Sequence, residues 1–191
     1  ESVWIAQRNG RTKDGIDRTD QGIINMFRMS FDGDKVQSVA DLNIVPVAVS
    51  YEWEPCDLLK VMELYISTQH KGTYVKKEGE DLNSILTGII QPKGKVHLAL
   101  CEPITKDDLL PFADLPSNEF NRRVASLIDQ RICTEYVLAS NNYIAHDILS
   151  GSDRYSSYYT TEEKEHFIRH FSSLESYADD CDVDEMKNIL L

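Results

Sequence analysis

Apolar residues recur along this chain with two spacings, one typical of strands and one typical of helices. Ser2–Gln7 is an apolar run, and we expect it to form a buried strand. The β-branched segment Asn43–Tyr51 predicts a central strand buried on both faces, with Pro46 near its start or at a bulge because proline has no amide donor. Lys95–Ile104 alternates between two faces and predicts a further strand. The strand–helix–strand order of this region favours parallel neighbours.

Helical spacing separates these strands. Asp20–Met29 reads as a helix with Asp20 as its N-cap, and Leu58–Thr68 as a second helix. Asp81 is expected to cap a third helix with an apolar stripe along one side. The stripe consists of Leu82, Ile85, Leu86, Ile89 and Ile90.

The pattern after Pro111 is helical throughout. A long helix begins at Ser117 and carries Phe120, Val124, Leu127, Ile128 and Ile132. Asn141–Leu149 predicts a shorter helix ended by Gly151, and Thr160 with Glu163 has capping-box spacing before another helix. The predicted fold class is therefore α/β, with a mixed sheet flanked by helices over residues 1–112. An all-helical extension over residues 113–191 follows.

Composition places the chain among folded globular proteins. It is 41% hydrophobic and 27% charged, with a formal net charge of −12. A pI near 4.8 argues against a general nucleic-acid binder and against electrostatic attachment to anionic lipid. The four cysteines form no CxxC pair and no zinc-ligand grouping, so we expect buried free thiols in a reducing compartment and no metal site.

A cluster of cations follows the first apolar run, which is unusual in so acidic a chain. The cations are Arg8, Arg11, Lys13 and Arg18, and Gly10 and Gly15 lie among them. Glycine permits tight or left-handed turns, and arginine offers a planar fork of donors for phosphate or carboxylate. The segment therefore predicts a loop that binds an anionic group, beside the positive end of the helix that follows. Alternatively, Asp14, Asp17 and Asp20 pair with these cations in a purely structural network.

Several blocks of sequence resemble the glycerolipid acyltransferases, the family of glycerol-3-phosphate and 1-acylglycerol-3-phosphate acyltransferases. The blocks are Val3–Gly15, Asp17–Thr19 and Ile44–Tyr51. The segments Asp81–Gly88, Gln91–Gly94 and Asn141–Asp147 are similar to a bacterial branch of the family, so the likeness covers most of the chain.

The resemblance implies a role in phospholipid biosynthesis at the cytoplasmic, inner face of a membrane. In the family, a histidine removes the proton from an acceptor hydroxyl, which attacks an acyl thioester of coenzyme A or acyl carrier protein. The acceptor is a glycerophosphate or lysophospholipid, and no bound cofactor is implied. Gly10 and Arg11 match the family's phosphate-gripping block best, Lys13, Arg18 and Arg8 are supporting cations, and Pro46 matches a pocket-shaping proline.

Two departures from the family pattern are visible. Asn9 stands where the family usually has glutamate, so the role of that carboxylate does not carry over. No histidine has an aspartate at the His-x-x-x-x-Asp spacing of the family's catalytic dyad. His97 and His170 have glutamates there, Glu102 and Glu175, which we interpret as coincidence.

The sequence therefore predicts no catalytic residue in this chain. The chain opens without Met and its last helical pattern stops without a cap, so we expect part of a longer enzyme, an incomplete acyltransferase-type domain. The longer enzyme is expected to contact the membrane peripherally. An exposed sheet edge at Ser2–Gln7 predicts homo-oligomers. The competing hypothesis is a non-catalytic α/β binding module with a structural cation loop.

Overall fold

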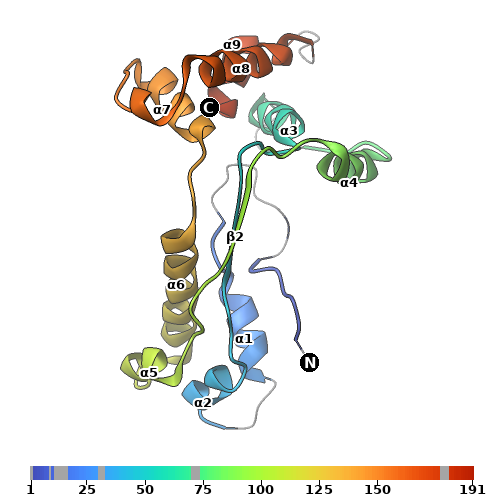
Figure 1. The fold of residues 1–191 in the computed structure, drawn as a ribbon. Coiled ribbons are helices and arrows are strands. Elements are labelled where there is room, and N and C mark those ends of the chain that lie inside the picture. Colours follow the sequence, from blue (N-terminus) through green and yellow to red (C-terminus); the bar gives the residue numbers. More distant parts are fainter. Residues whose placement is uncertain (1, 9, 11–16, 30–32, 70–73, 177–180) are drawn as a thin grey trace. The chain divides into compact units, whose positions relative to one another are not determined.

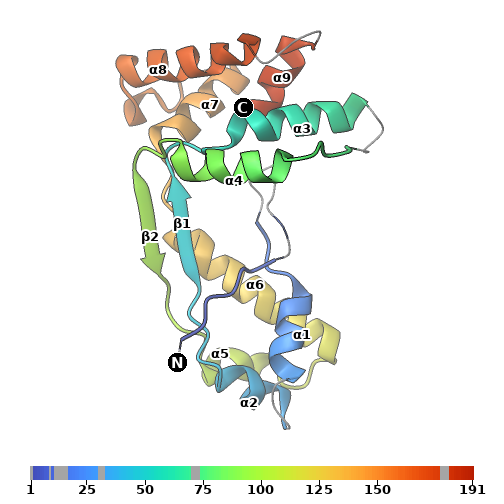
Figure 2. The ribbon, with the colours of Figure 1, turned by 90° about the vertical axis from the view of Figure 1, so that its right-hand side faces the viewer.

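The computed structural model describes residues 2–8, 10, 17–29, 33–69, 74–176 and 181–191. This part of the chain is mostly helical and contains one small sheet of two strands (Figures 1 and 2). The longer helices are α1 (Gln21–Met29), α3 (Asp57–Gln69), α4 (Glu80–Ile90), α6 (Ser117–Glu135), α7 (Ser140–Ser150), α8 (Thr161–Ser172) and α9 (Val183–Leu190). Shorter helices are α2 (Lys35–Ala40), α5 (Lys106–Leu109), η1 (Leu110–Phe112), η2 (Ser156–Tyr158) and η3 (Ser173–Ser176). The strands are β1 (Val47–Tyr51) and β2 (Val96–Leu100).

The chain forms two compact units, and each is built from two segments. Unit 1 contains residues 1–49 and 97–136, and unit 2 contains residues 50–96 and 137–191. The expected division near residue 112 lies inside unit 1, because the long helix α6 packs against α1. The helical character expected after residue 113 is confirmed, since no strand follows β2 in the described chain.

The core of unit 1 joins α1, α2, α5 and α6. Ile24 of α1, Val36 of α2 and Phe120 of α6 are completely or almost completely buried in one cluster. The cluster also contains Val39, Ile104, Leu109, Val124, Ala125 and Ile128. The helix predicted over residues 20–29 therefore contributes Ile24 to the core, and the apolar stripe predicted for the helix from Ser117 is a core face.

The core of unit 2 is smaller and joins α3 to α9. Val61 and Tyr65 of α3 pack against Leu174 and Met186. The predicted capping box is confirmed, since the Thr160 hydroxyl accepts from the Glu163 amide at 3.1 Å and the Glu163 carboxylate accepts from the Thr160 amide at 2.7 Å.

The two strands run antiparallel, so the expectation of parallel neighbours is wrong. The Cys101 amide donates to the Pro46 carbonyl at 2.9 Å, and the Glu52 amide donates to the Lys95 carbonyl at 2.8 Å. The segment between the strands contains α3 and α4, but it returns the chain beside β1 in the opposite direction. The mixed sheet that we expected is therefore a two-stranded antiparallel ribbon in the described residues.

The prediction for Asn43–Tyr51 is also only partly right. It expected a strand buried on both faces, whereas β1 is buried on one face only. Ala48 is buried whereas Val49 is exposed, and the register places Val49 opposite the exposed Leu98. Pro46 precedes the strand, as its missing amide donor required.

The Ser2–Gln7 prediction is wrong, since residues 2–7 form no strand. Val3 and Trp4 are 78% and 76% exposed. No described strand pairs with this segment, so the ladder of backbone hydrogen bonds that a buried strand requires is not formed there. The sheet edge on which the predicted homo-oligomer depended is not formed there.

Candidate functional site

A backbone hydrogen bond joins the two residues that flank the cation-rich segment, Gln7 and Asp20. The Asp20 amide donates to the Gln7 carbonyl at 2.8 Å, so the chain that leaves Gln7 returns to it after residue 19. Asn9, Arg11 and Lys13 lie outside the described residues, as does Gly15. The described part of the loop comprises Arg8, Gly10 and residues 17–20.

Asp129 of α6 holds the returning end of this loop. Its Oδ1 accepts hydrogen bonds from the Thr19 amide at 2.8 Å and from the Thr19 hydroxyl at 2.6 Å. Thr19 is buried. A carboxylate that accepts two hydrogen bonds from one residue fixes that residue's position, and α6 is itself held by the core of unit 1. The loop therefore starts and ends on a rigid base.

The helix α1 begins at Gln21, directly after the residue that closes the loop. The Asp20 carboxylate accepts from the Gly22 amide at 2.7 Å, a capping interaction that agrees with the predicted N-cap. The positive end of the α1 dipole therefore lies beside the loop. Asp20 places a carboxylate at the same end and offsets part of that positive charge.

The two described cations of the loop differ: Arg8 has an acidic partner, whereas Arg18 is exposed to solvent. Arg8 lies 4.0 Å from Asp17, and the two side chains are 35% and 56% exposed, so the ion pair is weak. This pair agrees with the structural interpretation of the loop. Arg18 is exposed, and Gly10 has a φ of +72°, in the left-handed region that favours glycine.

Pro46 lies outside the loop and directly precedes β1, and its carbonyl accepts a hydrogen bond from the Cys101 amide of the strand pair. The structure thus brings Arg8, Gly10, Arg18 and Thr19 into one closed segment and gives Pro46 a role in the neighbouring strand pair.

The histidines with dyad-like spacing are engaged elsewhere. His97 Nε2 lies 3.0 Å from the Glu135 carbonyl, and the backbone carbonyl of Glu102 accepts from Arg131. His170 Nε2 lies 2.6 Å from the Asp57 carboxylate, and its ring packs edge-on against Trp53 with centroids 4.7 Å apart. The hydrogen bond to Asp57 raises the pKa of His170, although burial opposes the shift. This pair clamps α8 to α3.

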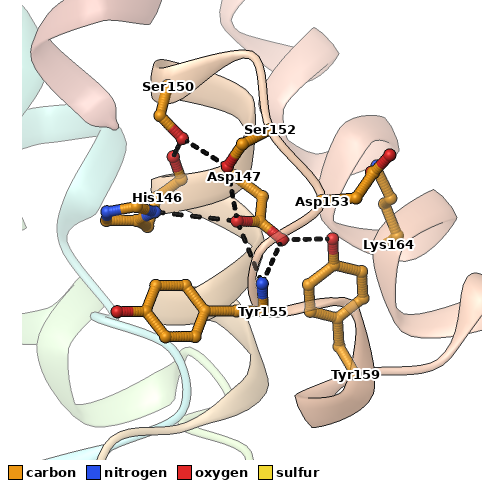
Figure 3. Close-up of polar contacts among 8 residues, drawn as sticks. All are labelled: His146, Asp147, Ser150, Ser152, Asp153, Tyr155, Tyr159 and Lys164. Carbon is orange, nitrogen blue, oxygen red and sulfur yellow. Dashed lines mark hydrogen bonds and ion pairs between the residues drawn. The ribbon is translucent and has the colours of Figure 1, made fainter.

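A second polar cluster surrounds Asp147 on α7 (Figure 3). The side chain is 2% exposed, and its carboxylate accepts from the Tyr155 amide and the Tyr159 hydroxyl, both at 2.9 Å, and from the Ser152 hydroxyl at 3.1 Å. Burial opposes ionisation, but the hydrogen bonds outweigh it and lower the pKa of Asp147. Burial and the bond to Asp147 raise the pKa of Tyr159. Asp147 therefore organises the turn between α7 and α8.

The sequence did not identify the residues that make these anchors. Asp129 lies in the middle of a long helix, 110 positions from Thr19, and Asp57 lies 113 positions from His170. Only a spacing or a motif could have indicated such pairs, and neither exists over these separations.

No metal or membrane-spanning element is found in the part of the chain that the structure describes. No group of three His, Cys, Asp or Glu side chains there could share a metal ion, and none of the helices is long and apolar enough to cross a bilayer. All four cysteines are free thiols, and the expectation that they are buried holds for Cys56 and Cys101, whereas Cys133 is exposed and Cys181 is partly exposed.

Compared with protein-family models, with curated proteins and with solved structures, the chain has no match.

Proposed function

We propose that this chain is the part of a glycerolipid-type acyltransferase that holds the phosphate of the acceptor. The observation that carries the proposal is the cationic segment between Gln7 and Asp20, closed by a backbone bond and anchored to α6 through Asp129. A loop with a fixed base and several guanidinium groups can present converging donors to a phosphate. In this proposal Arg11 is the leading ligand, and Arg8, Lys13 and Arg18 add charge.

The chemical step in this proposal belongs to groups outside residues 1–191. A histidine of a His-x-x-x-x-Asp dyad removes the proton of the acceptor hydroxyl, and the hydroxyl oxygen attacks the carbonyl carbon of the acyl thioester. The thiol of coenzyme A or acyl carrier protein leaves. The bound phosphate fixes the distance from the hydroxyl to the base.

The exposed face of the ribbon supports the same proposal. In unit 1, Val49, Leu98 and Leu100 are exposed apolar side chains that point to one face of the strand pair. An apolar sheet face in a globular protein is normally covered by a second layer. This face is suited to further strands and helices of a larger domain.

Ligand-induced stabilisation tests the phosphate site. Glycerol 3-phosphate at millimolar concentration is expected to raise the melting temperature of the chain, because a ligand that binds only the folded state stabilises it. Arg11→Ala is expected to abolish the shift. Arg169→Ala is the matched control, since Arg169 is an exposed arginine on α8 that lies 3.9 Å from Glu165. An equal shift of the melting temperature in the wild type and in Arg11→Ala would contradict the assignment of the phosphate site to this loop.

The chain of 191 residues is expected to bind the acceptor without transferring acyl groups to it. The measurement is release of free thiol from acyl-CoA in the presence of glycerol 3-phosphate or lysophosphatidate. Turnover that His97→Ala abolishes would overturn the assignment of the dyad to groups outside this chain.

The competing function is a non-catalytic binding module whose cation loop is structural. The Arg8–Asp17 pair favours it, because at least one loop cation has an internal partner. The same ligand experiment separates the two functions: a structural loop gives no shift with glycerol 3-phosphate in any variant. Peripheral contact of the complete enzyme with the inner face of a membrane is also part of our proposal.

A further inference from the structure

The helix α4 packs with its polar side inward and its apolar side outward. The small or polar residues Glu80, Ser84, Thr87 and Gly88 are half-buried. The five apolar residues of the predicted stripe are between 47% and 74% exposed. They are Leu82, Ile85, Leu86, Ile89 and Ile90. No residue of α4 is fully buried, so the stripe is not the core face that its sequence predicted.

One hydrogen bond joins α4 to the start of α3, and two others join its first residue to the segment that precedes the helix. The thiol of Cys56, which directly precedes α3, donates to the Ser84 carbonyl at 3.4 Å. The Glu80 carboxylate accepts from the Tyr74 hydroxyl at 2.7 Å and from the Lys77 amide at 3.0 Å. Burial and the bond to Glu80 raise the pKa of Tyr74 to about 12, so this hydroxyl remains a donor. The outward direction of the stripe agrees with the half-burial of the opposite side of α4.

The size of the stripe argues against a second copy of the chain as its partner. A stable protein interface buries about 800 Å² on each partner, far more than one face of an 11-residue helix provides. Each copy also carries a formal net charge of −12, so two copies repel each other.

The segment around α4 lacks the excess of negative charge that the chain has as a whole. Residues 76–95 contain four lysines and three carboxylates, a net charge of +1 in a chain whose total is −12. No charged residue interrupts the helix between Leu82 and Pro92, and Lys93 and Lys95 follow directly. The Lys93 ammonium donates to the Gln91 carbonyl at 3.1 Å, next to the apolar stripe. Lysines that flank an apolar helix face can extend to headgroups while the apolar side chains enter the acyl layer.

We propose that α4 lies in the plane of a phospholipid bilayer and buries its apolar stripe among the acyl chains. The inference deepens the membrane contact of the proposed function and rests on that function for the expectation that the acceptor comes from a membrane. Apolar burial drives the contact, because a local net charge of +1 gives little attraction to anionic lipid.

Flotation with phosphatidylcholine vesicles tests this proposal. The wild-type chain is expected to float with the vesicles to a similar extent at low and high salt, because screening does not weaken apolar burial. Leu86→Glu is expected to lower the vesicle-bound fraction about tenfold or more, since it puts a charge into the buried stripe. Leu149→Glu is the matched control, because Leu149 is a 55% exposed leucine on α7 of the same unit.

Circular dichroism and thermal unfolding establish that both variants keep the fold. Failure of the wild type to float, or flotation that Leu86→Glu leaves unchanged, would overturn the proposal. Self-association that is lost in Leu86→Glu, without vesicle binding by the wild type, would assign the stripe to a second copy instead. Arg11→Ala is expected to float like the wild type. Loss of the glycerol 3-phosphate shift with flotation intact therefore contradicts only the phosphate site, and the reverse result contradicts only the role of α4.

Discussion

The helices α6 and α4 have apolar stripes of the same kind and opposite surroundings. Both place five large apolar residues at helical spacing along one side. In α6 the stripe contains Phe120, Val124 and Ile128, which are all buried in the core of unit 1. In α4 every member is exposed. The comparison teaches that periodicity defines a face of a helix but does not define what covers that face.

Truncation of one isoleucine in each helix gives the largest expected contrast. Ile128→Ala is expected to lower the free energy of unfolding by about 2–5 kcal/mol, because it leaves a cavity in the core of unit 1. Ile89→Ala removes the same atoms from an exposed position and is expected to change this free energy by less than about 0.5 kcal/mol. Urea unfolding of both variants measures the difference. Equal losses would show that the α4 stripe is covered within the chain.

The contrast between a buried and an exposed side chain can also be tested with two aspartates. Asp147→Asn is expected to lower the melting temperature by at least about 5 °C, because an amide in this buried site can accept fewer of the hydrogen bonds that the carboxylate accepts. Asp153→Asn is the control, since Asp153 is exposed and its carboxylate lies 3.8 Å from the Lys164 ammonium. It is expected to leave the melting temperature unchanged.

The pKa of Asp147 also defines where this contribution depends on pH. Because the folded state lowers this pKa, the stabilisation is present above the ordinary aspartate value of 3.8 and is lost as the pH falls through the lowered value. Acid unfolding of Asp147→Asn that follows the wild-type curve in this range would contradict the role of the ionised group.

The partly exposed pair of His170 and Asp57 is expected to give the smallest effect. Its hydrogen bond raises the pKa of His170, so the extra stability is complete below the unfolded value of 6.5 and is lost as the pH rises through the higher folded value. We expect a loss of about 0.5–1 kcal/mol, because solvent screens a pair of this exposure. Urea unfolding between about pH 5.5 and pH 8.5 measures it.

Asp57→Asn is the matched variant for this measurement. It keeps the size of the side chain and removes its charge, so the part of the pH dependence that His170 contributes is expected to disappear. A wild-type pH dependence in Asp57→Asn would assign the titration to another group, and the clamp between α8 and α3 would lose its electrostatic part.

Sequence patterns alone determined much of the helical architecture. The capping box at Thr160, the end of α7 at Gly151 and the cap at Asp20 are local hydrogen-bonding or backbone requirements, and each is found where it was expected. The core face of α6 was also predictable, because its apolar residues recur with a period of 3.6 from Phe120 to Ile132. These features depend on residues within a few positions of one another.

Tertiary structure alone decided the strand pairing, the coverage of each face and the anchors of the cation loop. The β-branched residues around Val49 predicted a strand, but its direction relative to β2 depends on the path of the 44 residues between Tyr51 and Val96. The link from Thr19 to Asp129 and the outward stripe of α4 depend on which elements meet in space. Side-chain periodicity records only which residues share a face, and the partner of that face comes from distant parts of the chain or from another molecule.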